Sequence, residues 1–293
     1  MDKLKTAAAF ARSASRLRMT HADRIVLLKQ ADGLSNLVHY LESEKKEARP
    51  RESILYHHLK AELGILKDLF FPTSFRVLEY RDEAFPQRLR EISRPPSLLF
   101  ISGDGEDLLN RDFVVGLVGS RKPTDYGREV TCKLARELAV RKIPVLSGGA
   151  RGIDGIAHQS VLAAGGRTAA VLGSGLDRIY PPEHQRLFSD IEKEGLLITE
   201  YPPGTPPRPG HFPARNRILA GLCDALIVTE ASEGSGTLIT AGFAADYGRE
   251  VLAVPGSILT GSSRSCHTLI REGAALIESV SDIPGMEEKK CLL

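Results

Sequence analysis

Short runs of apolar residues recur along the second part of the chain at intervals of about 25–30 residues. The clearest run is Phe113–Val118, which holds five apolar residues and Gly116 without an alternating polar position. Such a run is typical of a strand that is buried on both faces of a parallel sheet. A helix-length segment fills each interval, so the pattern predicts repeated β–α units with right-handed crossovers. The strands are predicted to begin near Phe113, Ile143, Arg167, Leu196, Ala225, Glu250 and Ala275.

Residues 1–75 show helical periodicity instead. Leu34, Leu37 and Leu41 follow the spacing of one helix face, which suits helices packed in a small bundle. The opening segment Lys3–Arg18 is rich in Ala, Arg and Ser, as a transit peptide is, but we favour its interpretation as a first helix. The predicted helices are Ala7–Leu17, Ala22–Gln30, Ser35–Glu44 and Glu52–Leu69, and strands are expected at Phe75–Tyr80 and Ser97–Ile101.

These patterns together predict an α/β protein of two domains. A small all-α domain spans residues 1–75, and a doubly wound, mostly parallel sheet with helices on both faces spans residues 76–293. A chain of 293 residues is long enough to bury the core of both domains.

Composition narrows the class of protein. The net charge is only +2, so a nucleic-acid site would have to be a local patch of cations. The four cysteines form no C-x-x-C pair, which disfavours a disulfide framework or structural zinc and favours a reducing cytosol. No apolar run approaches membrane-spanning length, so we expect a cytoplasmic protein without a membrane partner.

Glycines, hydroxyl residues and arginines gather in the turns that follow the predicted strands. The carboxyl ends of parallel strands meet at one edge of the sheet, where helix amino ends favour anionic ligands. Pro213 suits the first turn of a helix, which places Arg215 and Arg217 near its start. We expect Arg121 and Arg215 to be surface groups whose charge can be reversed without harm to the fold.

These turns predict a site for the anionic backbone of a nucleic acid, with Tyr126 or Phe212 available to stack a base. The predicted binding residues are Gly119, Ser120, Arg121, Lys122, Tyr126, Ser147, Gly148, Gly149, Arg151, Gly152, Phe212, Arg215, Asn216, Arg217, Ser235, Gly236 and Thr237.

Several enzyme signatures are missing from the sequence. There is no G-x-x-x-x-G-K-[ST] loop, no H-E-x-x-H and no G-x-S-x-G, which disfavours the corresponding NTPases, metalloproteases and hydrolases. The turn after Phe113–Val118 also departs from the dinucleotide pattern G-x-G-x-x-G. His158 and His184 have no evident nucleophile beside them, so we expect structural or surface roles for both.

Five segments occur in order: G-S-R-K-P-T-D-Y-G, S-G-G-A-R-G-I-D-G-I-A-H, F-P-A-R-N-R-I-L-A-G-L, S-G-T-L-I-T-A and V-P-G-S. Together they resemble the DNA processing protein A family (DprA, also called Smf) over about residues 75–283. The helical N-terminus resembles the family's sterile-alpha-motif-like domain more loosely. Gly149 stands where the family often has Leu, and His184 and His267 stand where it often has Asn, so no function is carried onto either histidine.

The resemblance implies an extended Rossmann-like fold that binds single-stranded DNA without base specificity. It also implies a homodimer that loads the RecA recombinase during natural transformation, without enzymatic activity or a cofactor. Some members carry a further winged-helix domain, which we do not expect here because the chain stops just after the sheet domain.

Two other functions stay open at this point. A nucleotide-processing enzyme of the phosphoribohydrolase type could use the same crevice through the Gly234–Thr237 turn, with Glu230 or Glu233 as its carboxylate. A nucleotide-responsive regulatory protein is the third candidate. For a dimer, the sequence suggests the apolar segment from Leu269-Ile270 to Ala274–Ile277 as an interface.

Overall fold

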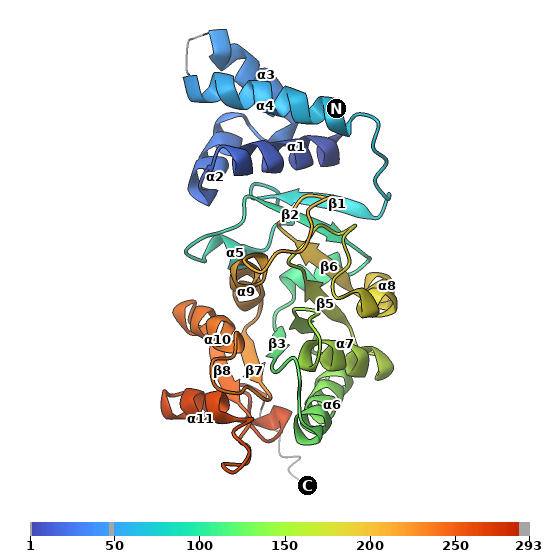
Figure 1. Ribbon diagram of the computed structural model, residues 1–293, viewed down its shortest axis with the longest axis vertical. Helices are drawn as coiled ribbons and strands as arrows, with labels where there is room; N and C mark the ends of the chain where they lie inside the picture. The colour runs from blue at the N-terminus through green and yellow to red at the C-terminus, as the bar shows by residue number, and fades with distance from the viewer. Residues whose placement is uncertain (1, 47–49, 287–293) are drawn as a thin grey trace. The chain divides into compact units, whose positions relative to one another are not determined.

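The structure, a computed structural model, describes residues 2–46 and 50–286, so the end of the predicted second domain lies outside these ranges. The chain forms two compact units (Figure 1). The first contains Met1–Ser102, Ser174–Arg178 and Ile198–Pro206, and the second contains the remaining segments. The first unit therefore extends past the predicted boundary at residue 75, because it includes the first two strands.

The first unit contains the predicted helices. Asp2 caps the first helix by accepting hydrogen bonds from the N–H groups of Leu4 and Lys5, and Thr20 forms a capping box with Asp23 on the second. Caps of this kind explain why α1 and α2 begin before the residues predicted from their apolar pattern. The elements are α1 (Lys3–Arg16), α2 (His21–Gln30), α3 (Leu34–Lys46), α4 (Pro50–Leu66), β1 (Phe75–Glu79), α5 (Gln87–Arg90) and β2 (Leu98–Ser102).

Packing in this unit combines an apolar core with buried acids, of which Glu62 is the more deeply buried. α1 packs against α3 and α4, and Phe10, Leu37 and Leu59 are fully buried. Glu62 is 2% exposed and accepts ion pairs from Arg12 at 3.4 Å and Arg16 at 2.9 Å. The strands β1 and β2 form an antiparallel pair.

The second unit alternates strands and helices as predicted. Its elements are η1 (Glu106–Asn110), β3 (Val115–Val118), α6 (Asp125–Val140), β4 (Val145–Ser147), α7 (Ile153–Ala163), β5 (Thr168–Val171), η2 (Pro182–His184), α8 (Gln185–Glu194), α9 (His211–Leu222), β7 (Ala225–Val228), α10 (Thr237–Asp246), β8 (Glu250–Ala253), α11 (Arg264–Arg271), β9 (Ala275–Leu276) and η3 (Val280–Asp282). The strand β6 (Leu196–Thr199) begins in the second unit and ends in the first.

Over the described ranges, the strands form one nine-stranded sheet in the order β1-β2-β6-β5-β4-β3-β7-β8-β9. β3 pairs in parallel with both β4 and β7, with Val115 opposite Val145 on one side and Ala225 on the other. The chain therefore leaves β3 toward β4, β5 and β6, and later returns to its other side with β7. This reversal of strand order beside β3 is the place where open α/β sheets bind ligands.

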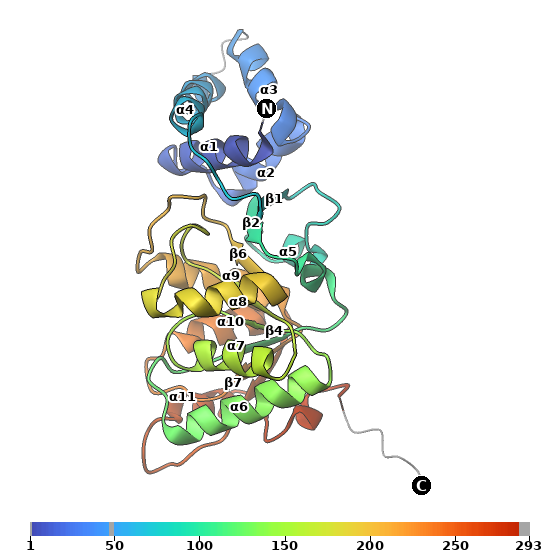
Figure 2. The ribbon, with the colours of Figure 1, turned by 90° about the vertical axis from the view of Figure 1, so that its right-hand side faces the viewer.

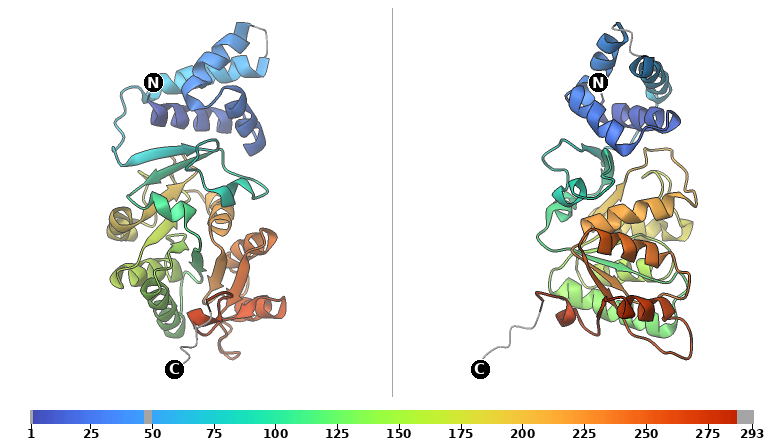
Figure 3. Two further views of the ribbon diagram at one scale, coloured as in Figure 1. Left: turned by 180° about the vertical axis from the view of Figure 1, so that it is seen from behind. Right: turned by 90° about the vertical axis from the view of Figure 1, so that its left-hand side faces the viewer.

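Helices cover both faces of the parallel part of the sheet. Figure 2 shows α6, α7 and α8 side by side over one face. The right-hand view of Figure 3 shows α9, α10 and α11, in orange to red, over the other. The prediction of a doubly wound, mostly parallel sheet is confirmed.

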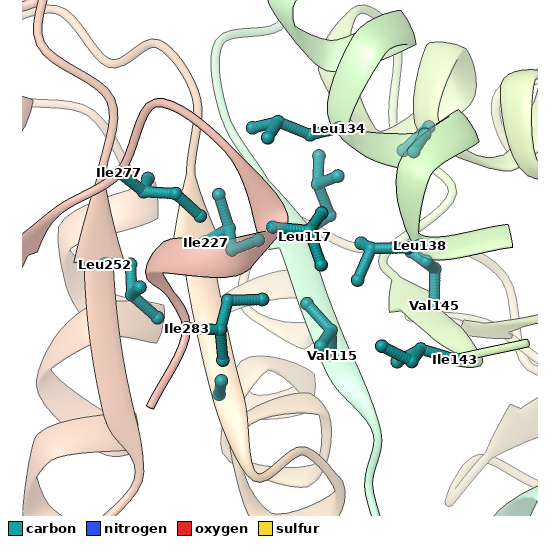
Figure 4. Close-up of a cluster of buried hydrophobic side chains, with 14 of the residues drawn as sticks. Val115, Leu117, Leu134, Leu138, Ile143, Val145, Ile227, Leu252, Ile277 and Ile283 are labelled. Carbon is teal, nitrogen blue, oxygen red and sulfur yellow. The ribbon is translucent and has the colours of Figure 1, made fainter. Parts of the chain in front are cut away.

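A core of branched aliphatic side chains lies between β3, its neighbours and α6 (Figure 4). Val115 and Leu117 from β3 are fully buried, as are Leu134 and Leu138 from α6 and Ile227 from β7. Full burial of each such side chain contributes about 1.5–3 kcal/mol, so this core fixes the strand ends and the turns that follow them. In the part of the chain that the structure describes, no helix combines the length and apolar character needed to span a membrane.

Candidate nucleic-acid interface

A cleft of about 710 Å³ opens at the carboxyl ends of β3, β4 and β7, beside the point where the strand order reverses. The turns before α6, α7 and α10 and the first turns of α9 form its walls. Among the predicted binding residues, those that line the cleft are Gly119, Ser120, Arg121, Lys122, Gly148, Phe212, Arg215, Asn216, Ser235, Gly236 and Thr237.

The turn from β3 to α6 is fixed by a buried carboxylate. Glu230 is 1% exposed and accepts a 3.0 Å hydrogen bond from the Thr124 N–H and a second from the Thr124 hydroxyl. Thr124 in turn caps α6 by accepting from the Gly127 N–H at 3.2 Å. Both oxygens of Glu230 are therefore used to hold the start of α6.

This arrangement weighs against the enzyme hypothesis. A catalytic carboxylate must face the bound substrate, whereas Glu230 faces the start of α6. The second candidate, Glu233, is exposed and pairs with Arg264 at 3.1 Å. It lines a different hollow from the cleft.

Main-chain hydrogen bonds tie the turns to one another. The Ser120 N–H donates to the Glu230 carbonyl at 2.7 Å, and the Ile153 N–H donates to the Ser120 carbonyl at 3.0 Å. On the α10 side, the Thr237 hydroxyl donates to the Gly119 carbonyl at 3.3 Å. The walls of the cleft are thus preorganised around the end of β3.

Gly152 makes the close approach of two turns feasible. Its φ is +74°, and a Cβ at this position would lie 2.3 Å from the Ser120 carbonyl oxygen. Gly149 also has a positive φ, and its neighbour is the Phe188 ring. Both glycines shape the turn and neither lines the cleft.

Exposed cationic side chains line the cleft. Arg121 and Lys122 are both exposed, and the Arg121 guanidinium lies 5.8 Å from the centre of the Phe212 ring. Arg151 is also exposed, lines a smaller adjoining hollow and forms a two-bonded ion pair with Glu183.

The expectation that Arg215 is a surface group is wrong. Its side chain is 4% exposed and donates to the carbonyls of Gly148, at 2.6 Å, and Val171. A Cβ at Gly148 would lie 2.6 Å from the guanidinium nitrogens, so a larger residue would have to displace the Arg215 side chain. Arg217 is also buried, at 3% exposure, and does not line the cleft.

The burial of Arg215 follows from the phase of α9. Arg215, Leu219 and Leu222 lie four and then three residues apart, which places them on one helix face. That face is turned toward the sheet, so Arg215 is buried with the two leucines.

Asp154 faces Arg215 across Gly148. Burial raises the pKa of the Asp154 carboxyl above its usual value, and the attraction of the Arg215 charge opposes this shift. The Asp154 carboxylate also accepts from the Ala150 N–H at 3.3 Å. The Asp154 carboxyl and the Arg215 guanidinium thus lie together beside Gly148, and both side chains are buried.

Two further predicted contacts are placed elsewhere. Ser147 is fully buried, donates to the Leu117 carbonyl at 2.6 Å and does not line the cleft. The reason is that Ser147 still belongs to β4 and points into the sheet. Tyr126 is 45% exposed, but its hydroxyl donates to the Pro255 carbonyl at 2.7 Å and its ring is not part of the cleft wall.

The structure adds two residues that the sequence analysis missed. Tyr180 is 40% exposed and lines the cleft, as does the exposed Arg208 in the loop before α9. Tyr180 follows β5 in a turn of the kind singled out for β3 and β4, which was the available signal. Arg208 lies between Pro207 and Pro209, and only the tertiary structure shows that it lines the cleft.

The cleft is not lined by His158, His184, Cys223 or Cys266. His158 is fully buried against the Thr168 hydroxyl at 2.7 Å, and burial lowers its pKa to about 3. His184 bonds to the Gly149 carbonyl at 3.0 Å. Burial raises the pKa of Cys223 to about 12 and that of Cys266 to about 11, so both thiols stay protonated.

Comparison with known families matches residues 76–287 to the model of DNA recombination-mediator protein A. The match covers the parallel sheet and every wall of the cleft. The chain belongs to the DNA recombination-mediator protein A family.

Individual members of the family are also similar to this chain in sequence. The DNA processing protein DprA of Streptococcus pneumoniae is 46% identical over 213 residues, which is 73% of this chain and 73% of that protein. The Protein Smf of Synechocystis is 44% identical over 204 residues, 69% of this chain. The matched segment is only 51% of the Synechocystis protein's length.

Solved structures of family members share the fold. The X-ray structure of DNA processing protein A from Streptococcus pneumoniae has a TM-score of 0.76 and 35% identity, covering 96% of this chain and 94% of that one. A Helicobacter pylori member, whose structure is described as giving insight into a unique single-stranded DNA binding mode, has a TM-score of 0.63 and 31% identity. That comparison covers 71% of this chain and 93% of the other.

Proposed function

We propose that this protein binds single-stranded DNA in the cleft beside β3, without reading the base sequence. The observation that carries the proposal is the exposed pair Arg121 and Lys122 at the point of strand reversal, with the Phe212 ring 5.8 Å from the Arg121 guanidinium. The single-stranded DNA binding mode described for the Helicobacter pylori relative supports it.

Phosphate binding is the first part of the proposal. Positive charge at the cleft comes from Arg121, Lys122 and Arg208. The buried Arg215 makes the electrostatic potential in the cleft more positive. The first turns of α6, α7, α9 and α10 present the positive ends of their dipoles to the same region. Contacts of this kind follow the sugar-phosphate backbone and carry no sequence information.

The preference for a single strand rests on Phe212. Its half-buried ring lies at the cleft wall, where an unpaired base can stack on it. Bases within a duplex are already stacked on one another and do not offer a free face. A stacking contact tolerates every base, because each has a π-face.

Beyond the binding of DNA, we propose that the bound strand is handed to the RecA recombinase and that the protein acts in the cytoplasm as a non-enzymatic mediator. The description of the family as a recombination mediator supports this role. We also propose a homodimer formed through α11 and β9, since β9 is the terminal strand of the sheet and Leu276 on it is 47% exposed.

Binding to labelled oligonucleotides tests the DNA proposal. Fluorescence anisotropy is measured with single strands of dT, dA and mixed sequence, and with the duplex of the mixed strand. We expect similar affinities for the three single strands and clearly weaker binding to the duplex. Equal binding to the duplex, or binding of one base composition alone, would contradict the proposal.

The nucleotide-processing alternative is tested with the same protein. A panel of nucleoside monophosphates is incubated with it and analysed for released base. We expect no turnover, and a turnover that Glu230→Gln abolishes would favour the enzyme instead.

A further inference from the structure

A row of alternating cationic and aromatic side chains borders the cleft on the side of β5. The Arg121 guanidinium lies 5.8 Å from the Phe212 ring centre, the Phe212 and Tyr180 ring centres are 5.5 Å apart, and the Arg151 guanidinium lies 5.9 Å from the Tyr180 ring centre. Each member comes from a different turn or helix start, so only the fold brings the row together.

The two rings of the row do not form a closed stack. Their planes are tilted by 47°. A base held between them would need about 7 Å, because carbon atoms in contact are about 3.5 Å apart on each side. The observed centre-to-centre distance between Phe212 and Tyr180 is 5.5 Å. Each ring therefore has to receive its own base.

Both rings are held in place by their surroundings. Phe212 lies against the backbone of Gly173, where a Cβ would come within 3.0 Å of the ring. Tyr180 lies between the Phe212 ring and the Arg151 guanidinium, which makes two hydrogen bonds to Glu183. With these neighbours, the Tyr180 side chain keeps 40% exposure.

The ion pair also sets the role of Arg151. Its charge is balanced by Glu183, and the hydrogen bond between them raises the pKa of Arg151 and lowers that of Glu183. An arginine balanced in this way attracts phosphate less than Arg121 does. Its planar group instead supports the Tyr180 ring.

We propose that Tyr180 and Phe212 hold two neighbouring bases of the same bound strand, so that the cleft contains a second stacking position at Tyr180. The inference rests on the proposed binding of single-stranded DNA and adds to it a specific residue and a register. The strand then runs from the Arg121 side of the cleft toward β5, with one base on each ring.

Tryptophan substitution provides a direct test, because the sequence contains no Trp and each variant carries a single fluorophore. The three variants are Tyr180→Trp, Phe212→Trp and the control Tyr126→Trp, which lies on α6 away from the row. Upon addition of dT oligonucleotide, we expect strong quenching in the first two proteins and little change in the control. Unquenched fluorescence in a Tyr180→Trp protein that still binds the oligonucleotide would overturn the inference.

Affinity provides the second test. Loss of one base-stacking contact is expected to weaken binding roughly 5- to 100-fold in Tyr180→Leu. Tyr180→Phe keeps the ring and should bind within about threefold of the wild type. Because a ring that merely supports the turn would also be rescued by Phe, the quenching measurement separates the two roles.

The outcomes also separate this inference from the proposed function. If the wild type binds the oligonucleotide and Tyr180→Leu binds equally well, the second stacking position is wrong and the DNA proposal stands. If the folded wild type does not bind single strands, the proposed function itself is wrong.

Discussion

Replacement of Arg215 by alanine should destabilise the second unit strongly, although the residue lines the cleft. Arg215 is 4% exposed, and its guanidinium donates to the Gly148 and Val171 carbonyls. Its removal also leaves Asp154, 7% exposed, without the positive charge that opposes its desolvation.

The magnitude follows from these contacts. A lost hydrogen bond from a charged donor costs about 1.5–3 kcal/mol, and leaving a buried carboxylate without a nearby opposite charge costs about 3–5 kcal/mol. These two estimates describe overlapping effects, so we expect a total loss of about 3–5 kcal/mol. A domain has only about 5–15 kcal/mol of stability, so the variant will be close to unfolding.

Urea unfolding followed by circular dichroism measures the change. Arg121→Ala is the matched control, because this exposed arginine should change stability by no more than about 0.5 kcal/mol. The double variant Arg215→Ala plus Asp154→Asn should recover about 0.5–3 kcal/mol relative to the sum of the single changes. A loss below about 1 kcal/mol in Arg215→Ala would refute the structural role assigned to this arginine.

Three further predictions concern pH, salt and assembly. Because burial lowers the pKa of His158 to about 3 from 6.5, the unfolded state takes up a proton first as the pH falls below 6.5. The free energy of unfolding therefore decreases by up to about 1.4 kcal/mol for each pH unit below that value. His158→Gln should weaken this pH dependence in urea titrations between about pH 7 and about pH 5. An unchanged pH dependence in the variant would contradict the burial of a neutral His158. If about four to six phosphates are neutralised, log K for single strands should fall against log salt with a slope of roughly −3 to −4, and salt-independent binding would remove the electrostatic part of the proposal. The double variant Ile270→Glu plus Leu276→Glu should be a monomer in light scattering. Leu269 is not changed in this test because it is only 9% exposed. A dimer that survives the double change would place the interface elsewhere.

The strand positions were predictable because a buried parallel strand needs an unbroken apolar run. Val115–Val118 and the later strands lie where the runs are, and the glycine-rich turns lie at their carboxyl ends. The meeting of these turns at one cleft then follows from parallel topology alone. The general location of the site therefore required no knowledge of side-chain packing.

Side-chain roles within the site were less predictable. The sequence places Arg215 near a helix start, but whether it points to solvent depends on the rotation of α9 against the sheet. Glu230 is equally plausible from sequence as a catalytic group or a helix-capping group, and only its contacts with Thr124 decide. Tyr180 and Phe212 are separated along the chain, so their 5.5 Å approach depends on tertiary structure.

Charge reversal at Arg121 tests the central claim most directly. Arg121→Glu removes an exposed cation at the cleft, and Arg128→Glu makes the same change at an exposed arginine of α6 that does not line it. Both variants should fold like the wild type, as judged by their urea midpoints. We expect Arg121→Glu to bind single-stranded oligonucleotide about 10- to 100-fold more weakly, whatever its base sequence, and Arg128→Glu to bind within about threefold of the wild type. Wild-type affinity in a folded Arg121→Glu protein would show that the cleft beside β3 is not the DNA-binding site.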